Sequence, residues 1–317
     1  MGGPYPSLED LRTGGKRLLA RVLTRLETHA SDAETARFLD GISGEAKAQV
    51  LGLTGPPGVG KSSLTDALIR ACRQQGERVA VLAIDPSSAI TGGALLGDRT
   101  RLKTDPSDDM VFVRSMAARD RLGGLSDHAV AAIVLLRAVC DRVIVETVGI
   151  GQSEGDLKQA VDTVVLCIQP GSGDSLQFMK AGIMELPDVV AVTKADMGAL
   201  ARRAASDVTG ALSLTTSDAG NWTVPVCMVS SQTGEGVADL VDQVGLHRDH
   251  LVSKALLESR RHLQHVSWFE DMVRSEFGQA GLRFQVSDHE TRWRERAALS
   301  PFTSFYELRE TVSKRLG

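Results

Sequence analysis

The chain has 317 residues, of which 42% are hydrophobic and 24% are charged, and its formal net charge at pH 7 is −4. This composition is typical of a folded globular protein and lacks the excess of lysine and arginine expected of a general nucleic-acid binder. Its longer apolar runs, such as residues 129–139, are too short and too interrupted to cross a bilayer, and the N-terminus shows no signal-peptide pattern. We therefore expect a cytoplasmic protein with no nucleic-acid or membrane partner.

Residues 1–46 are predicted to form a helical N-terminal arm. Leucine and valine recur at helical spacing between Leu8 and Leu26, which predicts a helix with one apolar face. Ser31 and Glu34 stand at the spacing of a capping box, in which a hydroxyl and a carboxylate satisfy N–H groups at the start of a helix. A second helix is therefore expected to begin there.

Residues 47–247 alternate short β-branched runs with helical stretches. Runs that are apolar on both faces and separated by helices indicate a mainly parallel sheet covered on both sides, so the predicted fold class is α/β. The expected strands are residues 50–53, 79–84, 110–113, 142–145, 163–168, 189–192 and 224–229.

Residues 248–317 are predicted to form a helical C-terminal arm. Its apolar side chains are too numerous for a solvated tail, so the arm must pack on its own sheet domain or on a second copy of the chain, with the second slightly favoured. These side chains are Leu256, Leu263, Trp268, Phe269, Met272, Val273 and Phe277.

Residues 55–62 form a complete G-x-x-x-x-G-K-[ST] phosphate-binding loop between an apolar run and a helical pattern. This order aims backbone N–H groups and the positive end of a helix dipole at one anion, and Lys61 adds a full charge. The central region is therefore predicted to be a P-loop NTPase, with Lys61 as a catalytic residue and Ser62 as an Mg²⁺ ligand. The expected phosphate-binding residues are Gly55, Pro57, Gly58, Val59, Gly60, Lys61, Ser62 and Ser63.

Two carboxylates follow strands whose carboxyl ends face the same crevice of an open sheet. Asp85 ends the run 79–84 and Glu146 ends the run 142–145. Because Mg²⁺ prefers hard oxygen ligands, we expect one or both of these carboxylates to serve the metal, directly or through water, and both are candidate catalytic residues. Gly149 completes an [DE]-x-x-G element, in which a backbone N–H can contact the γ-phosphate.

The segment Thr193-Lys194-Ala195-Asp196 resembles the [NT]-K-x-D element that selects guanine. The Asp196 carboxylate can accept from the guanine N1–H and amino group, which adenine does not offer, so GTP is expected in preference to ATP. A loop with Ser230, Ser231 and Gln232 follows the last expected strand and is predicted to contact the base. Thr193 replaces the commoner Asn, so we expect amide contacts to the base and the phosphate loop to be lost.

The cysteine and histidine residues are not arranged as a metal site. Cys72, Cys140, Cys167 and Cys227 are far apart and are expected to be reduced packing residues. Two His-x-x-His pairs, His247/His250 and His262/His265, have no third ligand nearby, so we expect exposed helix surface at both.

Several motifs together resemble the MeaB/ArgK family. Beside the phosphate loop, they are residues 85–88, 91–101, 146–154 and 170–174, which span much of the chain. The resemblance implies a GTPase that attends an adenosylcobalamin-dependent acyl-CoA mutase, delivering intact cofactor and helping to remove damaged cofactor. It also implies a homodimer formed largely through the C-terminal arm, an adenosyltransferase as a further candidate partner, and no cobalamin bound by this chain itself.

The resemblance also assigns residues that the spacing alone does not. Asp98 becomes a candidate for the Mg²⁺ environment and for the first switch, and Gln152 is a further switch residue. Asp174 and Lys180 belong to a third switch loop that begins at Gln169. Because Ile150 follows Gly149 where Ras-like proteins carry a catalytic Gln, no water-positioning residue is evident, and we expect slow turnover that a partner stimulates.

Three alternative functions remain open from the sequence. A nickel-insertion GTPase chaperone shares the fold and the nucleotide chemistry but is disfavoured by the absence of a Cys/His cluster. An ATP-dependent small-molecule kinase would need a second substrate pocket and a different base site, and a nucleotide-gated scaffold would not depend on hydrolysis. The client mutase also stays open among those acting on methylmalonyl-CoA, isobutyryl-CoA and 2-hydroxyisobutyryl-CoA.

Overall fold

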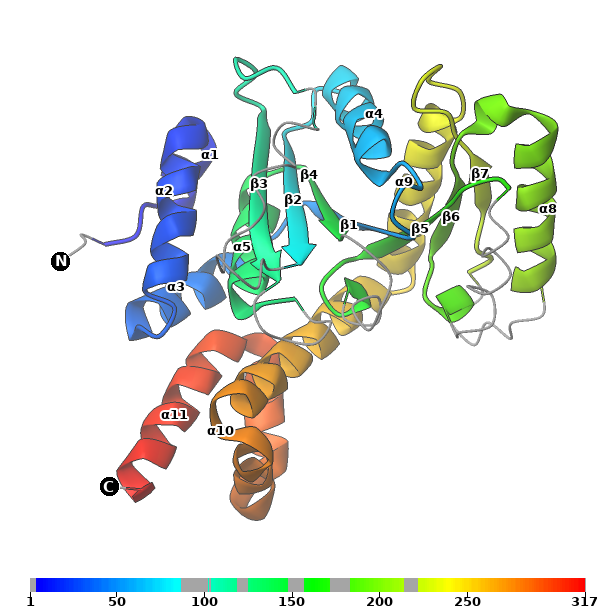
Figure 1. Ribbon diagram of the computed structural model, residues 1–317. Helices are drawn as coiled ribbons and strands as arrows, with labels where there is room; N and C mark the ends of the chain where they lie inside the picture. Colours follow the sequence, from blue (N-terminus) through cyan, green and yellow to red (C-terminus); the bar gives the residue numbers. More distant parts are fainter. Residues whose placement is uncertain are drawn as a thin grey trace. The chain divides into compact units, whose positions relative to one another are not determined.

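The computed structural model describes residues 4–86, 102, 104–118, 125–147, 157–171, 183–213 and 222–316. The chain divides into two compact units, each of which is described by itself (Figure 1). One comprises Met1–Ala48, Asp127–Val139 and Ala255–Gly317, and the other comprises Gln49–Ser126 and Cys140–Lys254.

The second unit is built on a parallel sheet, which confirms the predicted α/β class. In the described residues this sheet has seven strands in the order β3-β2-β4-β1-β5-β6-β7. All residues of β1, β4, β5 and β6 are buried, as expected of strands whose two faces are both covered. The strands are β1 (Gln49–Thr54), β2 (Val79–Pro86), β3 (Val111–Ala118), β4 (Arg142–Thr147), β5 (Thr163–Ile168), β6 (Val189–Val192) and β7 (Val226–Met228).

Strand β1 lies at the point where the order of the sheet reverses. The chain runs from β1 outward to β2 and β3 on one side, returns in β4, and then continues through β5, β6 and β7 on the other side. Ligands of open α/β sheets bind at such a switch point, beyond the carboxyl ends of the strands. The segment that leaves β1 is the predicted phosphate loop.

Helices cover both faces of the sheet. α4 (Lys61–Gln74) and α9 (Val237–Ser253) contact each other and pack on one face, and α8 (Ala199–Leu212) packs on the other (Figure 1). Successive strand residues alternate between these layers, as the pleat requires. Val165 belongs to the core beneath α4 and α9, whereas Leu166 packs with Val208 of α8.

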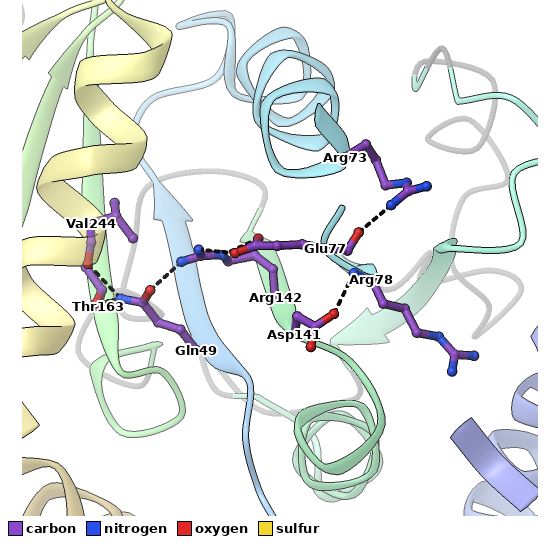
Figure 2. Close-up of polar contacts among 8 residues, drawn as sticks. All are labelled: Gln49, Arg73, Glu77, Arg78, Asp141, Arg142, Thr163 and Val244. Carbon is purple, nitrogen blue, oxygen red and sulfur yellow. Dashed lines mark hydrogen bonds and ion pairs between the residues drawn. The ribbon is translucent and has the colours of Figure 1, made fainter. Parts of the chain in front are cut away.

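A buried polar network joins the amino ends of the strands, opposite the phosphate loop. Figure 2 shows Arg142 of β4 between Glu77 and Gln49, with Gln49 continuing to Thr163 of β5 and Val244 of α9. Arg142 Nη2 lies 2.8 Å from Glu77 Oε1. Partial burial raises the pKa of Glu77, but the hydrogen bond and charge of Arg142 act against it, and the pKa is lowered on balance. The network therefore satisfies polar groups that would be costly to bury alone.

The network reaches His247 of α9. His247 Nε2 lies 3.3 Å from Asp188 Oδ1, and His247 Nδ1 lies 2.9 Å from Thr163 Oγ1. The expected exposed surface at the histidine pairs is wrong for His247 and His265, which are 1% and 7% exposed. In the part of the chain that the structure describes, no three His, Cys, Asp or Glu side chains are grouped as metal ligands.

The first unit is helical, as expected of both arms. Its described helices are α1 (Leu8–Thr13), α2 (Gly15–Thr28), α3 (Ala33–Ser43), α5 (Asp127–Val139), α10 (Leu256–Leu299) and α11 (Pro301–Leu316). The predicted capping box is misplaced, since Ser7 and Asp10 form one at α1. Helix α3 begins after Asp32 without a side-chain cap, and Glu34 instead pairs with Arg25 at 2.9 Å.

Helix α10 doubles back on itself. Gly278 has a φ of +61°, and His265 Nδ1 lies 2.8 Å from the carbonyl oxygen of Ala298, so the residues before and after Gly278 run side by side. Phe269 and Val273 are completely buried in a core with Leu308 of α11. Phe269 and Val273 are therefore covered by their own helical unit, and their burial needs neither the sheet domain nor a second copy.

The four cysteines are free and buried, which confirms their expected packing role. Burial raises the pKa of Cys72, Cys140 and Cys167 to about 12 and that of Cys227 to about 11. These thiols are therefore protonated at neutral pH and unreactive. Of the helices that the structure describes, none combines the length and apolar character needed to span a membrane.

Candidate nucleotide site

The phosphate loop connects β1 to α4 through glycines in conformations that other residues rarely adopt. Gly55, Gly58 and Gly60 have φ values of +138°, +76° and +99°. A Cβ atom on Gly55 would lie 2.3 Å from the carbonyl oxygen of Cys167 in β5, whereas nothing lies within 4 Å of a Cβ on Gly58 or Gly60. Gly55 is thus required by close packing, and the other two leave space where a phosphate can approach the backbone.

Lys61 is the first residue of α4 and is 6% exposed. Its ammonium donates to the carbonyl oxygens of Gly55 at 2.6 Å and Pro56 at 3.0 Å. The side chain therefore folds back over its own loop and places a positive charge beside the helix N-terminus. A charge in this position adds to the helix dipole in attracting an anion.

Ser62 and Glu146 meet at the carboxyl ends of the strands. Ser62 Oγ donates to Glu146 Oε1 at 2.7 Å, and Thr65 Oγ1 donates to Glu146 Oε2 at 2.8 Å. Glu146 is only 5% exposed, and the two hydroxyl donors hold both oxygens of its carboxylate in place. This set of a hydroxyl and a carboxylate oxygen fits Mg²⁺, which binds hard oxygen ligands and retains several waters.

Thr65 is a residue of this cluster that the sequence interpretation missed. It follows Ser62 by three positions in α4, and residues at that spacing share a helix face. The spacing alone could have suggested it, but its contact with Glu146 depends on how α4 packs against β4. The hydroxyl of Thr65 also lies 3.1 Å from the carbonyl oxygen of Lys61, which links it to the start of the helix.

The expected base-recognition residues come together at the carboxyl ends of β6 and β7. Ser230 Oγ donates to Asp196 Oδ1 at 2.7 Å, and Ser230 is completely buried whereas Asp196 is exposed. The hydroxyl thereby fixes one carboxylate oxygen and leaves the side chain accessible. Ser231 and Gln232 follow in the same loop; Ser231 is half-buried and Gln232 is exposed.

Thr193 contacts the phosphate loop directly. Its hydroxyl lies 2.7 Å from the carbonyl oxygen of Val59 and 3.1 Å from that of Ile168. Thr193 has no amide, but its hydroxyl still joins the base segment to the phosphate loop. A hydroxyl has one proton to donate, and the shorter distance assigns it to Val59.

Several predicted site residues lie outside the described residues. They are Asp98, Gly149, Gln152, Asp174 and Lys180. Asp85 is located as a backbone position near the carboxyl end of β2, where it pairs with Ala117 of β3, but its side chain is outside the described part. The described site therefore consists of the phosphate loop, the Ser62–Thr65–Glu146 cluster and the base segment.

The family model described as methylmalonyl-CoA mutase-associated GTPase MeaB matches residues 19–283. A Pyrococcus horikoshii protein is 41% identical over 263 residues, with 80% of each chain covered, and the GTPase ArgK of Escherichia coli is 31% identical over 321 residues, with 96% of each covered. The structure titled "Crystal structure of LAO/AO transport system kinase" matches at a TM-score of 0.70 and 25% identity, covering 96% of each chain.

The family match covers the phosphate loop, the Ser62–Thr65–Glu146 cluster and the base segment, so it includes the residues that form the described site. The match to the solved structure extends the agreement to the parallel sheet and its flanking helices. The chain belongs to the MeaB family of P-loop GTPases and hydrolyses GTP.

Proposed function

We propose that this GTPase is a chaperone of an adenosylcobalamin-dependent acyl-CoA mutase, supporting delivery of intact cofactor and protection or reactivation of the mutase. The observation that carries the proposal is the family match, because the matched model is described as a mutase-associated GTPase. The nucleotide site supplies the GTP-dependent part of this role. The resemblance suggests no cobalamin bound by this chain, and the cytoplasmic location stays a prediction.

In the proposed reaction, water attacks the γ-phosphorus of GTP in line with the departing GDP oxygen. Lys61 would stabilise negative charge on the β- and γ-phosphate oxygens, because its ammonium already lies at the phosphate loop. Ser62 and Glu146 would hold Mg²⁺, with Asp85 and Asp98 as further candidate ligands. When bound, Mg²⁺ supplies electrostatic neutralisation of the phosphate oxygens.

Guanine recognition would depend on the oriented carboxylate of Asp196. Ser230 fixes one carboxylate oxygen at 2.7 Å, which reduces the freedom that Asp196 would lose on binding a base. Guanine presents two N–H donors to such a carboxylate, and adenine presents none at that edge. Lys194, Ser231, Gln232 and the Gly149 backbone complete the proposed nucleotide contacts.

The proposed assembly is a homodimer formed through residues 248–317, next to a GTPase domain of residues 47–247 and an N-terminal arm of residues 1–46. Leu256 and Leu263 of α10 are 37% and 72% exposed, so they offer apolar contact area that the described residues do not cover. An adenosyltransferase is a further proposed partner. Asp98, Gln152, Asp174 and Lys180 stay the proposed switch residues.

The test is GTP hydrolysis by the purified protein with and without each candidate mutase, with ATP as the control nucleotide. The candidates are the mutases that act on methylmalonyl-CoA, isobutyryl-CoA and 2-hydroxyisobutyryl-CoA. We expect slow turnover alone and a large, GTP-selective stimulation by one mutase, which identifies the client. Stimulation by none of the three, or fast turnover by the isolated protein, would contradict the proposal.

The same assay separates the alternatives. An ATP-dependent kinase would hydrolyse ATP, or transfer its γ-phosphate to a small molecule, in preference to GTP. A metal chaperone would bind nickel, although the described residues contain no group of three metal-ligating side chains. A scaffold would support the mutase equally well with a GTP analogue that cannot be hydrolysed.

A further inference from the structure

Two consecutive residues of the base segment each join the phosphate loop to the end of β5. Thr193 donates its backbone N–H to the Ile168 carbonyl at 2.8 Å, and its hydroxyl lies 2.7 Å from the Val59 carbonyl. Lys194 then places its ammonium 2.6 Å from Gln169 Oε1 and 3.4 Å from the Gly58 carbonyl. Thr193 and Lys194 together therefore contact two consecutive residues of the phosphate loop, Gly58 and Val59. They also contact Ile168, the last residue of β5, and Gln169, which follows it.

The backbone of Lys194 has a conformation that residues with a side chain rarely adopt. Its φ of +55° is in the left-handed region, which a residue with a side chain adopts at a cost of roughly 1–3 kcal/mol. The neighbouring backbone is fixed, because Ala195 donates to the Val229 carbonyl at 3.0 Å. A strained position held by neighbours on both sides is typical of functional sites.

We propose that Gln169 is a positioning residue of the base site, which holds the ammonium of Lys194 at the phosphate loop and thereby slows the release of guanine nucleotide. The proposal rests on the proposed base site at Lys194 and Asp196. Lys194 is exposed, and an exposed lysine side chain loses rotational freedom when it is held in one place. A side-chain acceptor that holds it before the nucleotide arrives removes part of that cost from binding.

The chemistry of an amide suits this position. A glutamate at this position would form an ion pair with the ammonium and partly cancel the positive charge that it offers to an anionic ligand. The carbonyl of Gln169 is neutral, so it orients the ammonium without cancelling its charge. Gln169 also directly follows Ile168, whose carbonyl accepts from Thr193, so a shift of this end of β5 would move both contacts together.

The test measures the dissociation rate of mant-GDP, a fluorescent ribose-linked GDP, from the full chain with Mg²⁺ present. Gln169→Leu removes the acceptor at similar size, and we expect dissociation about fivefold faster, with KM for GTP raised by a similar factor and kcat unchanged. Gln169→Glu keeps an acceptor and should stay within about threefold of the parent. Gln75→Leu, at the exposed C-terminal end of α4, is the matched control.

A double-mutant cycle with Lys194→Met separates this role from a general loss of stability. If Gln169 acts by holding Lys194, Gln169→Leu changes the dissociation rate by less than about twofold when Lys194 is already replaced. Independent, multiplicative effects of the two substitutions would overturn the proposal. So would an unchanged dissociation rate for Gln169→Leu in a protein whose melting temperature equals that of the parent.

Asp196→Asn distinguishes failure of this inference from failure of the proposed base site. We expect this variant to lose its preference for GDP over xanthosine diphosphate, because the carboxylate no longer accepts from guanine. If Asp196→Asn loses that preference while Gln169→Leu has no effect, the positioning role alone is wrong. If Asp196→Asn keeps the preference for guanine, the base site is elsewhere and both proposals fall.

Discussion

The hydroxyl of Ser62 at the start of α4 donates a 2.7 Å hydrogen bond to Glu146 at the end of β4. These residues are far apart in the sequence and belong to elements that neighbour the same strand, β1. The contact places a carboxylate beside the phosphate loop, and Thr65 holds its second oxygen. It is the most direct indication of where a divalent cation would sit.

Glu146→Gln is expected to raise the Mg²⁺ concentration needed for half-maximal GTP hydrolysis by at least about tenfold. The amide keeps the shape of the side chain but loses the negative charge that attracts the cation. The measurement is a Mg²⁺ titration of steady-state hydrolysis at saturating GTP. Glu45→Gln, at an exposed position, is the control, and an unchanged titration for Glu146→Gln would exclude Glu146 from the metal environment.

Gly55→Ala is expected to destabilise the sheet unit and abolish GDP binding. Its Cβ would lie 2.3 Å from the Cys167 carbonyl oxygen, at a φ of +138°, so β1 and β5 must separate. We expect a loss of at least about 2 kcal/mol in the free energy of unfolding. The measurement is urea unfolding with and without GDP.

Gly58→Ala is the matched comparison for that substitution. It adds the same methyl group at a φ of +76°, but into open space, so backbone strain should cost about 1–2 kcal/mol without a clash. Equal destabilisation of the two variants would mean that the close approach to Cys167 does not decide the result.

The parts of the site that local sequence determines could be predicted well. The phosphate loop is defined by glycine spacing, and Glu146 was found because a polar residue directly follows an apolar strand. Thr65 could not be found in this way, since its role depends on the packing of α4 against β4. The tie from Thr193 to Val59 was missed for a similar reason, because it joins residues distant in sequence.

The helical unit shows the same limit at the level of the fold. Helical periodicity correctly predicted the helices that the structure describes in the C-terminal arm, α10 and α11. It gave no sign that α10 reverses direction, because a glycine such as Gly278 within a helical pattern has several possible roles. That reversal is what buries Phe269 and Val273 within their own unit. His247 was misjudged because its three-residue spacing from His250 indicates a shared face without indicating that the face is buried.

Thr193→Val is expected to weaken GDP binding by about fivefold to tenfold while preserving the shape of the side chain. The substitution leaves the Val59 carbonyl without the 2.7 Å hydrogen bond that now orients the phosphate loop. The measurement is calorimetric titration with GDP. Thr209→Val is the control, since the exposed Thr209 hydroxyl donates to the Ala205 carbonyl of its own helix α8. Equal affinities for both variants would argue against a role of the Thr193 hydroxyl in nucleotide binding.

His265 is expected to make the helical unit less stable in acid. Burial lowers the pKa of His265 to about 4 from an ordinary value of 6.5, against a hydrogen bond to Ala298 that raises it, and the nearby charges of Arg137, His262 and Arg261 lower it further. Between pH 6.5 and pH 4 the unfolded chain therefore binds a proton that the folded chain does not. Stability is at its full value above pH 6.5 and falls as the pH decreases toward 4.

His265→Gln is expected to remove this contribution, which amounts to at most about 1.4 kcal/mol per pH unit within that window. An amide can still donate to the Ala298 carbonyl and accept from Ser43, the two groups that His265 now contacts. The measurement is urea unfolding at several values between pH 4.5 and pH 7.5. His262→Gln, one helical turn earlier and exposed, leaves the burial of His265 in place, and because burial is the largest cause of its lowered pKa, most of the parent slope should remain. An unchanged slope for His265→Gln would show that another group causes the acid sensitivity.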